Sequence, residues 1–322
     1  MNREIRIGDL QENDRFSGYC VISDIQLRTA KSGRPYLSAV LSDAEDSIDA
    51  KMWDYGGPVG REDNARAVWA QGTVTEFNGA LQITLTQLRL TDARDAGKFA
   101  PEDLVPSAPM DADAALAAVR ELVSSIGDPD YRKAATCMLD RHEKAFRTIP
   151  AAKSVHHDFL SGLLMHTANM MHTADFLADL YAPVIDRSLL LAGTLLHDFA
   201  KEQEFTFSDL GLVCDYSVPG DLLGHLYLGA RETADVCREL GIPEEKSILL
   251  QHMILSHHGE PEYGACVRPR CAESELLSLI DRMDSRMEIY AKALSSTPEG
   301  SFSPPVYAIG KSVYRHALPD EP

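Results

Sequence analysis

Residues 1–92 contain short segments in which apolar and polar positions alternate, the period of two that is typical of half-buried strands. Stretches rich in glycine, proline, asparagine and aspartate, which favour turns, separate these segments. In "SIDAKMWD" the alternation puts Ile48 and Ala50 on one face and Lys51 and Trp53 on the other. We therefore predict five strands, within "FSGYCVISDIQL", "PYLSAVLSD", "SIDAKMWD", "RAVWAQGTVTEF" and "LQITLTQLRL".

From about residue 110 the apolar positions instead recur every three or four residues, which is the period of an amphipathic helix. The first such segment, "DADAALAAVRELVSSI", opens on aspartates that suit a helix N-terminus. The tail from residue 294 is rich in serine, proline and glycine, and we predict it to be irregular. We predict further helices near 128–147, 155–181, 187–200, 225–240, 243–258 and 272–293.

These two patterns predict a multidomain α and β protein. Five short strands in fewer than 100 residues favour a small closed sheet, most simply an OB-fold β-barrel. Segment 97–110 contains three prolines and is the best candidate for a linker. We therefore predict an N-terminal five-stranded OB-fold over residues 1–96, a linker over 97–110, and an all-α domain with its irregular tail over 111–322.

The composition, 44% hydrophobic and 25% charged, is that of an ordinary globular protein. No apolar run reaches the roughly 18 residues that span a bilayer, and the charged N-terminus leads us to expect no signal peptide. The six cysteines are scattered without a CxxC pair, which suits reduced thiols. We expect a cytoplasmic protein with no membrane partner.

The net charge of −18 weighs against a nucleic-acid partner, because phosphates favour basic surfaces. The charge is uneven, however: residues 1–100 hold 12 Lys and Arg against 15 Asp and Glu, or −3, which leaves −15 for the other 222 residues. Some acids of the helical part can be metal ligands. The charge therefore does not exclude nucleic acid.

All eleven histidines lie in the helical part, and the stretch "LLHDFAK" places His197 and Asp198 after a long apolar run. Burying an unpaired carboxylate is costly, so Asp198 needs a compensating partner. Neighbouring helix positions point about 100° apart, so these two residues suit two adjacent ions better than a single shared one. We predict that this pair is the centre of a metal site.

Four other histidines and one aspartate have positions suited to the same site. His166 lies in mid-helix among apolar neighbours, and His225 follows a glycine at a predicted helix start. His257 and His258 lie in the last turn of a helix, where both side chains can turn to one ion. Asp281 lies beside residues of a buried helix face.

Helical phase excludes two further histidines, because His252 and His172 point away from the candidate ligands on their own helices. His142 lies in the charged run "LDRHEKAF", and we expect it in solvent. Asp284 is three residues after Asp281 and is either its support or a surface acid.

The order of these residues resembles the HD superfamily of metal-dependent phosphohydrolases, in particular the members that bind two metals. The resemblance implies that Asp198 bridges two ions and that Lys201 contacts phosphate; the alternative for Lys201 is a surface lysine. A glutamate that holds a third metal in some members is replaced here by Gly162, which implies two ions. By this resemblance one ion is held by His166, His197, Asp198 and Asp281, and the other by Asp198, His225, His257 and His258.

Nitrogen and oxygen ligands without thiolate suit Mn²⁺, Fe²⁺, Co²⁺ or Zn²⁺. Two such ions about 3.5–4 Å apart lower the pKa of a shared water to about 7 and clamp phosphoryl oxygens. The predicted cofactors are two divalent metal ions, and the predicted reaction is attack of the activated water on a phosphodiester.

Over nearly its whole length the chain is similar to the YhaM-type 3′–5′ exoribonucleases, in which an OB-fold precedes an HD domain. The resemblance implies degradation of single-stranded RNA, and also single-stranded DNA, from the 3′ end to nucleoside monophosphates, with Mn²⁺ or Co²⁺; we predict Mn²⁺. His156 and His157 match paired histidines of the family, with substrate contact and helix packing as alternative roles. The matching stretches are "TAKSGRPYLSAVLSDAEDSIDAKMWD", "SVHHDFLSGLLMHT", "LLHDFAK", "LLGHLYLG", "HMILSHHG" and "LIDRMDSRM".

OB-folds bind single strands on one barrel face, where aromatic side chains stack on bases. Trp53 and Phe77 resemble such stacking positions, and Lys51, on the face of Trp53, suits a phosphate contact. The alternative for Trp53 is a position covered by the helical domain, and the alternative for Phe77 is a position in the barrel core. The sequence leaves the role of Tyr36 open. We predict these four residues as the nucleic-acid-binding set.

Two other functions compete with an exonuclease. One is a phosphohydrolase of nucleotides or cyclic dinucleotides with the barrel as an accessory module, for which a tryptophan at a stacking position is superfluous. The other is a non-enzymatic single-strand binder, against which the complete ligand set weighs. The sequence leaves open whether the chain forms a homo-oligomer.

Overall fold

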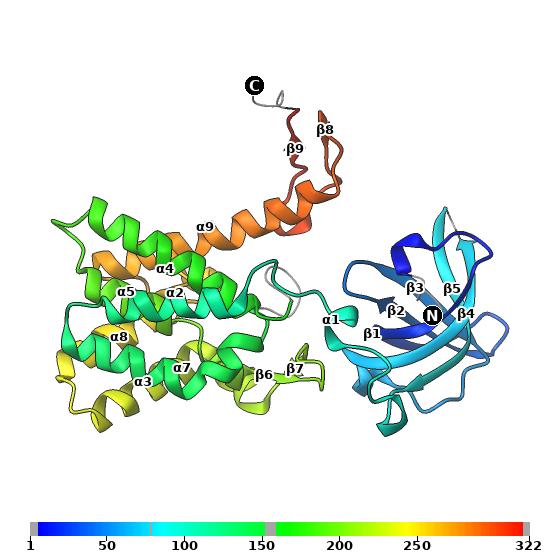
Figure 1. The fold of residues 1–322 in the computed structure, drawn as a ribbon, viewed down its shortest axis with the longest axis horizontal. Helices are drawn as coiled ribbons and strands as arrows, with labels where there is room; N and C mark the ends of the chain where they lie inside the picture. The colour runs from blue at the N-terminus through cyan, green and yellow to red at the C-terminus, as the bar shows by residue number, and fades with distance from the viewer. Residues whose placement is uncertain (1–5, 78, 152–158, 318–322) are drawn as a thin grey trace. The chain divides into compact units, whose positions relative to one another are not determined.

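The computed structural model describes residues 6–77, 79–151 and 159–317. The chain divides into two compact units, Met1–Ser107 with Phe207–Cys214 and Ala108–Thr206 with Asp215–Pro322. The first unit holds a β-barrel and the second holds all but one of the described α-helices (Figure 1). Nothing in the sequence pattern marks residues 207–214 as part of the first unit.

The first unit is a closed barrel with the strand order β1-β2-β3-β5-β4. Neighbouring strands are antiparallel except β3 and β5, which are parallel. A closed five-stranded barrel of this kind is an OB-fold, so the predicted fold class is confirmed for this unit. The strands are β1 (Arg15–Thr29), β2 (Pro35–Ser42), β3 (Ser47–Trp53), β4 (Arg66–Phe77) and β5 (Ala80–Leu90).

The barrel interior is filled by aliphatic side chains that alternate with outward-facing polar ones. Ile22, Leu37 and Ile83 come from three different strands and are fully buried. On β3 the expected alternation is present, since Ala50 is buried whereas Trp53 is 50% exposed. The outer face of the barrel is therefore left with an exposed tryptophan, which is unusual for so large an apolar side chain.

The second unit is a helical bundle in which three helices begin at an aspartate. Asp111, Asp128 and Asp186 each accept hydrogen bonds from backbone N–H groups two and three residues further on, which caps the helix. The chain's helices are α1 (Pro101–Leu104), α2 (Ala112–Ser124), α3 (Pro129–Thr148), α4 (Gly162–Leu180), α5 (Arg187–Leu196), α6 (Lys201–Glu204), α7 (Val218–Glu239), α8 (Glu244–Ser256) and α9 (Ala272–Ser295).

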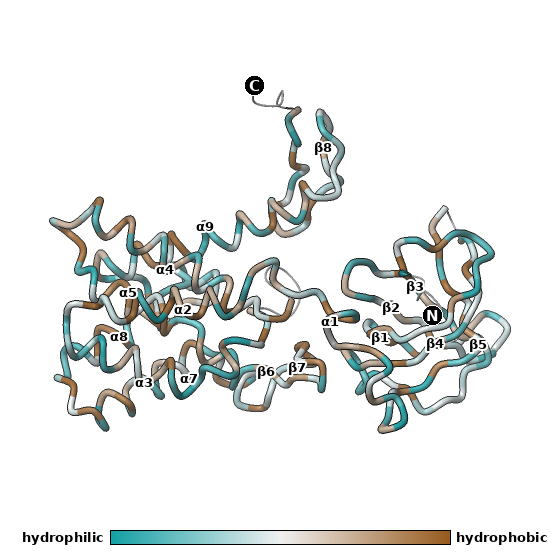
Figure 2. Tube along the Cα trace, in the orientation of Figure 1, coloured by the Kyte–Doolittle hydropathy of each residue, from teal (hydrophilic) through white to brown (hydrophobic). Residues whose placement is uncertain are grey.

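Helix α5 lies at the centre of this unit. It packs against α2, α3, α4, α8 and α9, and every residue from Leu189 to Leu196 is buried. Its apolar composition explains this placement, because a helix that is hydrophobic on all sides is stable only in a core (Figure 2). The C-terminal end of α5 carries His197 and Asp198 into the interior of the bundle.

Several elements differ from the sequence-based expectation. The helix expected over 187–200 ends at Leu196, and the one expected from 225 begins at Val218 and is kinked at Gly224. The tail is not wholly irregular, because β8 (Ser301–Phe302) pairs with β9 (Tyr314–Arg315). A second small hairpin, β6 (Phe205–Phe207) with β7 (Val213–Tyr216), was not predicted. His156 and His157 lie outside the described residues.

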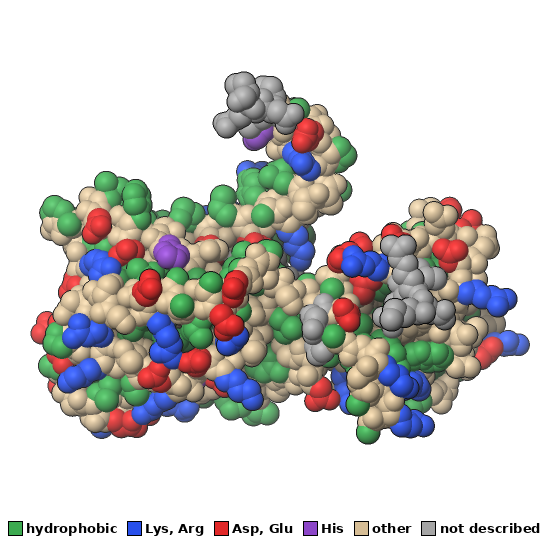
Figure 3. Space-filling view, in the orientation of Figure 1, with side chains coloured by type: hydrophobic (Ala, Val, Ile, Leu, Met, Phe, Trp, Pro, Cys, Tyr) green, Lys and Arg blue, Asp and Glu red, His purple; other side chains and the backbone are tan. Residues whose placement is uncertain are grey.

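Charge is mixed on the face of the helical unit that Figure 3 shows, where acidic and basic side chains are interspersed. The net charge of −18 therefore does not form one acidic patch on that face. In the part of the chain that the structure describes, no helix combines the length and the apolar composition that crossing a membrane requires.

Candidate metal centre

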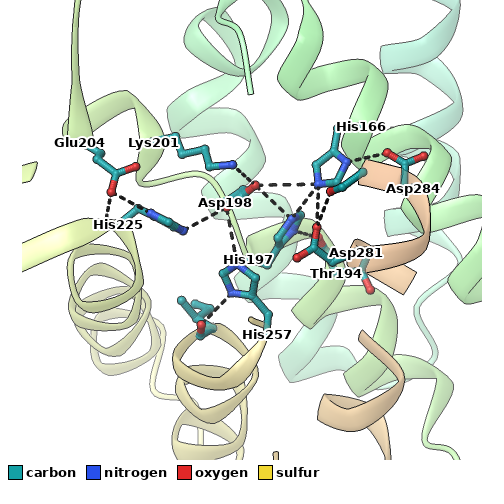
Figure 4. Close-up of polar contacts among 12 residues, drawn as sticks. His166, Thr194, His197, Asp198, Lys201, Glu204, His225, His257, Asp281 and Asp284 are labelled. Atoms are coloured by element: carbon teal, nitrogen blue, oxygen red, sulfur yellow. Dashed lines mark hydrogen bonds and ion pairs between the residues drawn. The ribbon is translucent and has the colours of Figure 1, made fainter. Parts of the chain in front are cut away.

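The seven predicted metal ligands come from five segments of the helical unit and meet at the end of α5. The nitrogen and oxygen atoms of His166, His197 and Asp198 lie within 4.8 Å of one another, and so do those of a second group, His225, His257 and His258. Asp281 joins the first group, since its Oδ1 is 3.4 Å from His166 Nε2. Figure 4 shows the side chains of His166, His197, Asp198, His225, His257 and Asp281 converging from separate parts of the chain.

Asp198 lies between the two groups and faces both. Its Oδ2 is 3.2 Å from His197 Nε2 and 3.9 Å from His166 Nε2. Its Oδ1 is 3.4 Å from His225 Nε2 and 3.7 Å from His257 Nε2. One carboxylate thus presents one oxygen to each group, which is the arrangement that a bridging ligand needs.

The turn that follows α5 explains how neighbouring residues reach one centre. After Leu196 the backbone makes hydrogen bonds to the third rather than the fourth preceding residue, from Lys201 N to Asp198 O (3.0 Å) and from Glu202 N to Phe199 O (3.2 Å). This tighter turn replaces the continuous helix that was expected there. It also brings the Lys201 ammonium 2.6 Å from Asp198 Oδ2.

Four histidines are oriented by a hydrogen bond from Nδ1. His197 and His257 donate to the backbone carbonyls of residues three positions earlier, at 2.7 and 2.8 Å. His166 and His225 bond to carboxylates, Asp284 Oδ2 at 2.6 Å and Glu204 Oε1 at 2.9 Å. Because a carbonyl or carboxylate oxygen only accepts, Nδ1 carries the proton, and each Nε2 faces the centre.

The electrostatics of the centre bring anionic, neutral and cationic groups together. Burial lowers the pKa of His257 and of His258, so both imidazoles are neutral. Burial alone would raise the pKa of Asp198, but Lys201 and His197 hold it well below its ordinary value. Burial likewise opposes charge on His166, whereas the Asp281 and Asp284 carboxylates raise its pKa to about 9. A cation bound at His166 Nε2 therefore displaces a proton.

The residues present fit a pair of divalent cations. Asp198 Oδ1, His225 Nε2 and His258 Nδ1 are buried and make no hydrogen bond to any residue that the structure describes. Buried polar atoms without partners are costly, and a cation facing them removes that cost. Imidazole nitrogens and carboxylate oxygens, without thiolate, are donors that suit Mn²⁺, Fe²⁺, Co²⁺ and Zn²⁺.

Two acids near the centre have roles that the sequence alone did not assign. Glu204 accepts from both the backbone N–H and Nδ1 of His225, and no spacing rule connects residues 21 positions apart. Asp284, for which two roles were left open, bonds His166 rather than Asp281. Its spacing of three residues from Asp281 was the available signal, because both side chains lie on one helix face.

The histidines excluded by helical phase lie elsewhere. His172 is exposed, and His252 Nε2 accepts from the Arg270 backbone N–H at 2.9 Å. The expectation for His142 was wrong: its side chain is only 11% exposed and bonds to Glu202 and Glu232. A charged run in the sequence does not reveal which charges face another helix.

The four residues predicted to bind nucleic acid share one outer face of the barrel. Tyr36 on β2 is paired directly with Trp53 on β3, and their ring centroids are 4.9 Å apart. The Lys51 ammonium lies 4.6 Å from the ring centroid of Phe77, which is 55% exposed. Phe77 is therefore not a core residue, and the face carries two neighbouring aromatic surfaces and one cation.

Two solved structures resemble part of the chain. The protein PriB from Ralstonia solanacearum is 17% identical and covers 26% of this chain and 100% of its own, with a TM-score of 0.20. The second OB-fold domain of replication protein A from Methanococcus maripaludis is 16% identical and covers 27% of this chain and 94% of its own, with a TM-score of 0.21. TM-scores this low add nothing to the barrel topology described above.

Sequence relatives cover much more of the chain. Residues 163–286 match the HD domain family, and this range contains all seven predicted ligands. The 3′–5′ exoribonuclease YhaM of Shouchella clausii is 33% identical over 99% of this chain and 98% of its own length. The protein of the same name from Halalkalibacterium halodurans is 33% identical over 97% of this chain and 96% of its own. With an OB-fold, an HD domain and this identity over nearly the full length, the chain belongs to the YhaM family of 3′–5′ exoribonucleases.

Proposed function

We propose that this chain is a metal-dependent 3′–5′ exonuclease that degrades single-stranded RNA, and also single-stranded DNA, to nucleoside monophosphates. The observation that carries the proposal is the position of Asp198, which presents one oxygen to each of two groups of histidine nitrogens. The full-length similarity to proteins named 3′–5′ exoribonuclease supports the direction and the substrate.

The proposed ligands form two sets that share Asp198. Two divalent cations, which we propose to be Mn²⁺, lower the pKa of water and neutralise phosphate charge when bound. Four of the five histidines, all except His258, provide lone pairs on Nε2, and the bonds from Nδ1 to Glu204, Asp284 and backbone carbonyls hold these four rings in place. The sets are His166, His197, Asp198 and Asp281, and Asp198, His225, His257 and His258.

Lys201 is the proposed phosphate contact. Its ammonium has three donors, and one of them is directed to Asp198 Oδ2 at 2.6 Å. Among the described residues the ammonium makes no other hydrogen bond, and the side chain keeps 12% of its surface exposed, so the remaining donors can meet a phosphate oxygen of the scissile group. In this role Lys201 orients the phosphate beside Asp198 and balances charge that develops on its oxygens.

The barrel is proposed to hold the single strand upstream of its 3′ end. Tyr36 with Trp53 offers one stacking surface, Phe77 offers another, and Lys51 contributes a cation for phosphate. Each stacked base contributes about 1–3 kcal/mol. In this proposal residues 1–96 bind nucleic acid, 97–110 connect, and 111–322 carry out hydrolysis in the cytoplasm, where cysteines stay reduced.

The reaction is tested with single-stranded RNA labelled at its 5′ end, incubated with Mn²⁺. We expect the wild type to produce a ladder that shortens from the 3′ end, and Asp198→Asn to leave the RNA intact because the shared ligand is lost. The matched control is Asp235→Asn, which removes a surface carboxylate whose ion pair among the described residues is with Arg238, on its own helix turn. Release of the label as the first product, or full activity of Asp198→Asn, would contradict the proposal.

The role of the barrel is tested with Trp53→Ala on substrates of two lengths. We expect KM for a long RNA to rise roughly tenfold, which corresponds to about 1.4 kcal/mol of lost stacking, while hydrolysis of a dinucleotide is unchanged. Tyr307→Ala removes another exposed aromatic, located in the helical unit, and should leave both substrates unaffected. An equal loss on both substrates for Trp53→Ala would remove the barrel from substrate binding.

A further inference from the structure

The His142 side chain connects three helices near the candidate metal centre, α3, α6 and α7. It lies on α3, where its Nδ1 is 2.7 Å from Glu202 Oε2 on α6 and its Nε2 is 2.7 Å from Glu232 Oε1 on α7. The ring also stacks on Phe199, the residue that follows Asp198, with centroids 5.6 Å apart and planes 22° apart. A histidine with both nitrogens bonded to carboxylates donates from both, and is therefore an imidazolium.

Helix α6 consists of a single turn and presents different residues on its two sides. Lys201 bonds to Asp198, and Glu204 bonds to His225, so these two side chains serve the metal centre. Glu202 and Gln203 point to the other side, toward α3 and α7. A helix of one turn is not stable by itself, so its position depends on such contacts.

The contacts on that other side form a closed ring of hydrogen bonds. Glu202 bonds to His142, His142 bonds to Glu232, and Glu232 accepts from Gln203 Nε2 at 2.5 Å, which returns to α6. Glu232 lies two turns after His225 on α7, so the two residues share a helix face. The ring therefore fixes α6 relative to the same helix that carries one of the proposed ligands.

The charge of His142 depends on the groups that face it from these helices. Those groups are Glu202 from α6 and Glu232 from α7; on its own helix, the neighbouring Arg141 pairs with Glu239. The bonds to Glu202 and Glu232 outweigh burial and raise the pKa of His142 to about 9. The imidazolium is therefore complete near neutral pH and loses its proton as the pH rises through about 9.

We propose that His142 is a positioning residue, which acts through Glu202 and Glu232 to hold the one-turn helix α6 and thereby places Lys201 and Glu204 at the metal centre. The inference rests on the proposed function, because it gives Lys201 and Glu204 their tasks. It predicts that the reaction needs the positive charge of a residue that touches neither metal ligand nor substrate.

The test compares His142→Gln with the wild type across pH. We expect kcat on 5′-labelled RNA with Mn²⁺ to fall about tenfold at pH 7 with KM nearly unchanged, in the range found for residues that orient ligands. The ratio of the wild-type kcat to the His142→Gln kcat should fall toward one by pH 10, since the wild type then loses the positive charge of His142. The free energy of unfolding of the wild type should decline over the same interval, because a raised pKa stabilises the fold below about 6.5 and no longer does so above about 9.

Two further variants separate positioning from simple packing. Arg141→Gln removes the neighbouring surface ion pair with Glu239. The ratio of the wild-type kcat to the kcat of this variant should stay near one at every pH. Glu202→Gln removes a half-exposed partner with little change in volume and should reproduce part of the loss. The dissociation constant of Mn²⁺, measured by calorimetry at pH 7, should rise for both His142→Gln and Glu202→Gln.

The outcomes are distinct. If the wild type with Mn²⁺ does not shorten RNA, the proposed function fails. If it does, but His142→Gln has the wild-type kcat and Mn²⁺ affinity at pH 7, the inference fails. A lower unfolding temperature with a kcat ratio that is the same at every pH would also overturn it, because that result describes a structural residue only.

Discussion

A histidine can bind a cation through Nε2 only when its other nitrogen keeps the proton, and at this centre four different acceptors ensure that. His197 and His257 use carbonyls within their own helix turn, which need no additional residue. His166 and His225 depend on carboxylates from distant segments. Single substitutions outside the proposed ligand set should therefore weaken cation binding only at His166 and His225.

Glu204→Gln tests this dependence. The neutral amide is a weaker acceptor for His225 Nδ1, so the dissociation constant of Mn²⁺ should rise about tenfold, at the lower end of the effect known for such partners. Isothermal titration calorimetry at constant pH measures it. Glu239→Gln, which alters a surface glutamate paired with Arg141, is the matched control. Equal affinities for the two variants would show that His225 needs no carboxylate partner.

At this scale the sequence predicted the candidate ligands, whose side chains the structure brings together, but not the residues that bond to them. His197 and Asp198 were recognisable because charged and polar groups follow an apolar run. Glu204 was not, because its contact joins residues 21 positions apart through a turn that no periodicity describes. His142 was assigned to solvent because the sequence shows its charged neighbours but not the glutamates of two other helices.

At the scale of elements, the kink in α7 sets the direction of His225. Gly224 has φ 72° and ψ 159°, a conformation open almost only to glycine, in the middle of an otherwise helical segment. A β-carbon there would meet no atom within 4 Å, so backbone conformation rather than space requires the glycine. The helix that was expected to start at 225 therefore starts afresh after this residue.

Gly224→Ala should disturb both the fold and the centre. Holding alanine in that conformation costs about 1–3 kcal/mol, which lowers the free energy of unfolding or straightens the helix and moves His225. Chemical denaturation and Mn²⁺ titration measure the two effects. Gly241→Ala, another glycine with positive φ but at the end of α7, should affect stability alone. Unchanged Mn²⁺ affinity in Gly224→Ala would show that the kink does not orient the ligand.

The periodicity of the sequence predicted most helices and all five barrel strands, since both are set by alternation of apolar and polar residues. It failed where hydrogen bonding changes within an apolar run. Residues 187–200 have one continuous pattern, yet the helix stops at Leu196 and a tight turn follows. The short hairpins of 205–216 and 301–315 contain too few alternating positions to be recognised.

At the scale of the whole molecule, the net charge of −18 is hard to reconcile with tight binding through phosphates alone. The barrel carries only −3 over residues 1–100, and its aromatic face includes one cation, Lys51, beside Phe77. Affinity for a single strand should therefore come mainly from stacking, which does not release counterions.

The salt dependence of RNA binding measures how much of the affinity comes from stacking and how much from phosphate contacts. For single strands the slope of log K against log salt is about −0.7 per phosphate contact, so one to three contacts give a slope between about −0.7 and −2. Binding of a non-cleaved RNA to the metal-free protein, followed by fluorescence anisotropy from low to moderate salt, provides the slope. Lys51→Gln should make it shallower by about 0.7. A slope steeper than about −4 would mean that phosphate contacts dominate.

The exposed position of Trp53 has a practical consequence. The chain has two tryptophans, and the other, Trp69, lies on the barrel with the Arg89 guanidinium 5.5 Å from its ring centroid. A base that stacks on Trp53 quenches its emission, so a Trp69→Phe protein reports occupancy of the barrel without any dye. We expect Mn²⁺ added after the signal has settled to start cleavage, so that arrival of the strand and release of its nucleotides become two separately timed events in one cuvette.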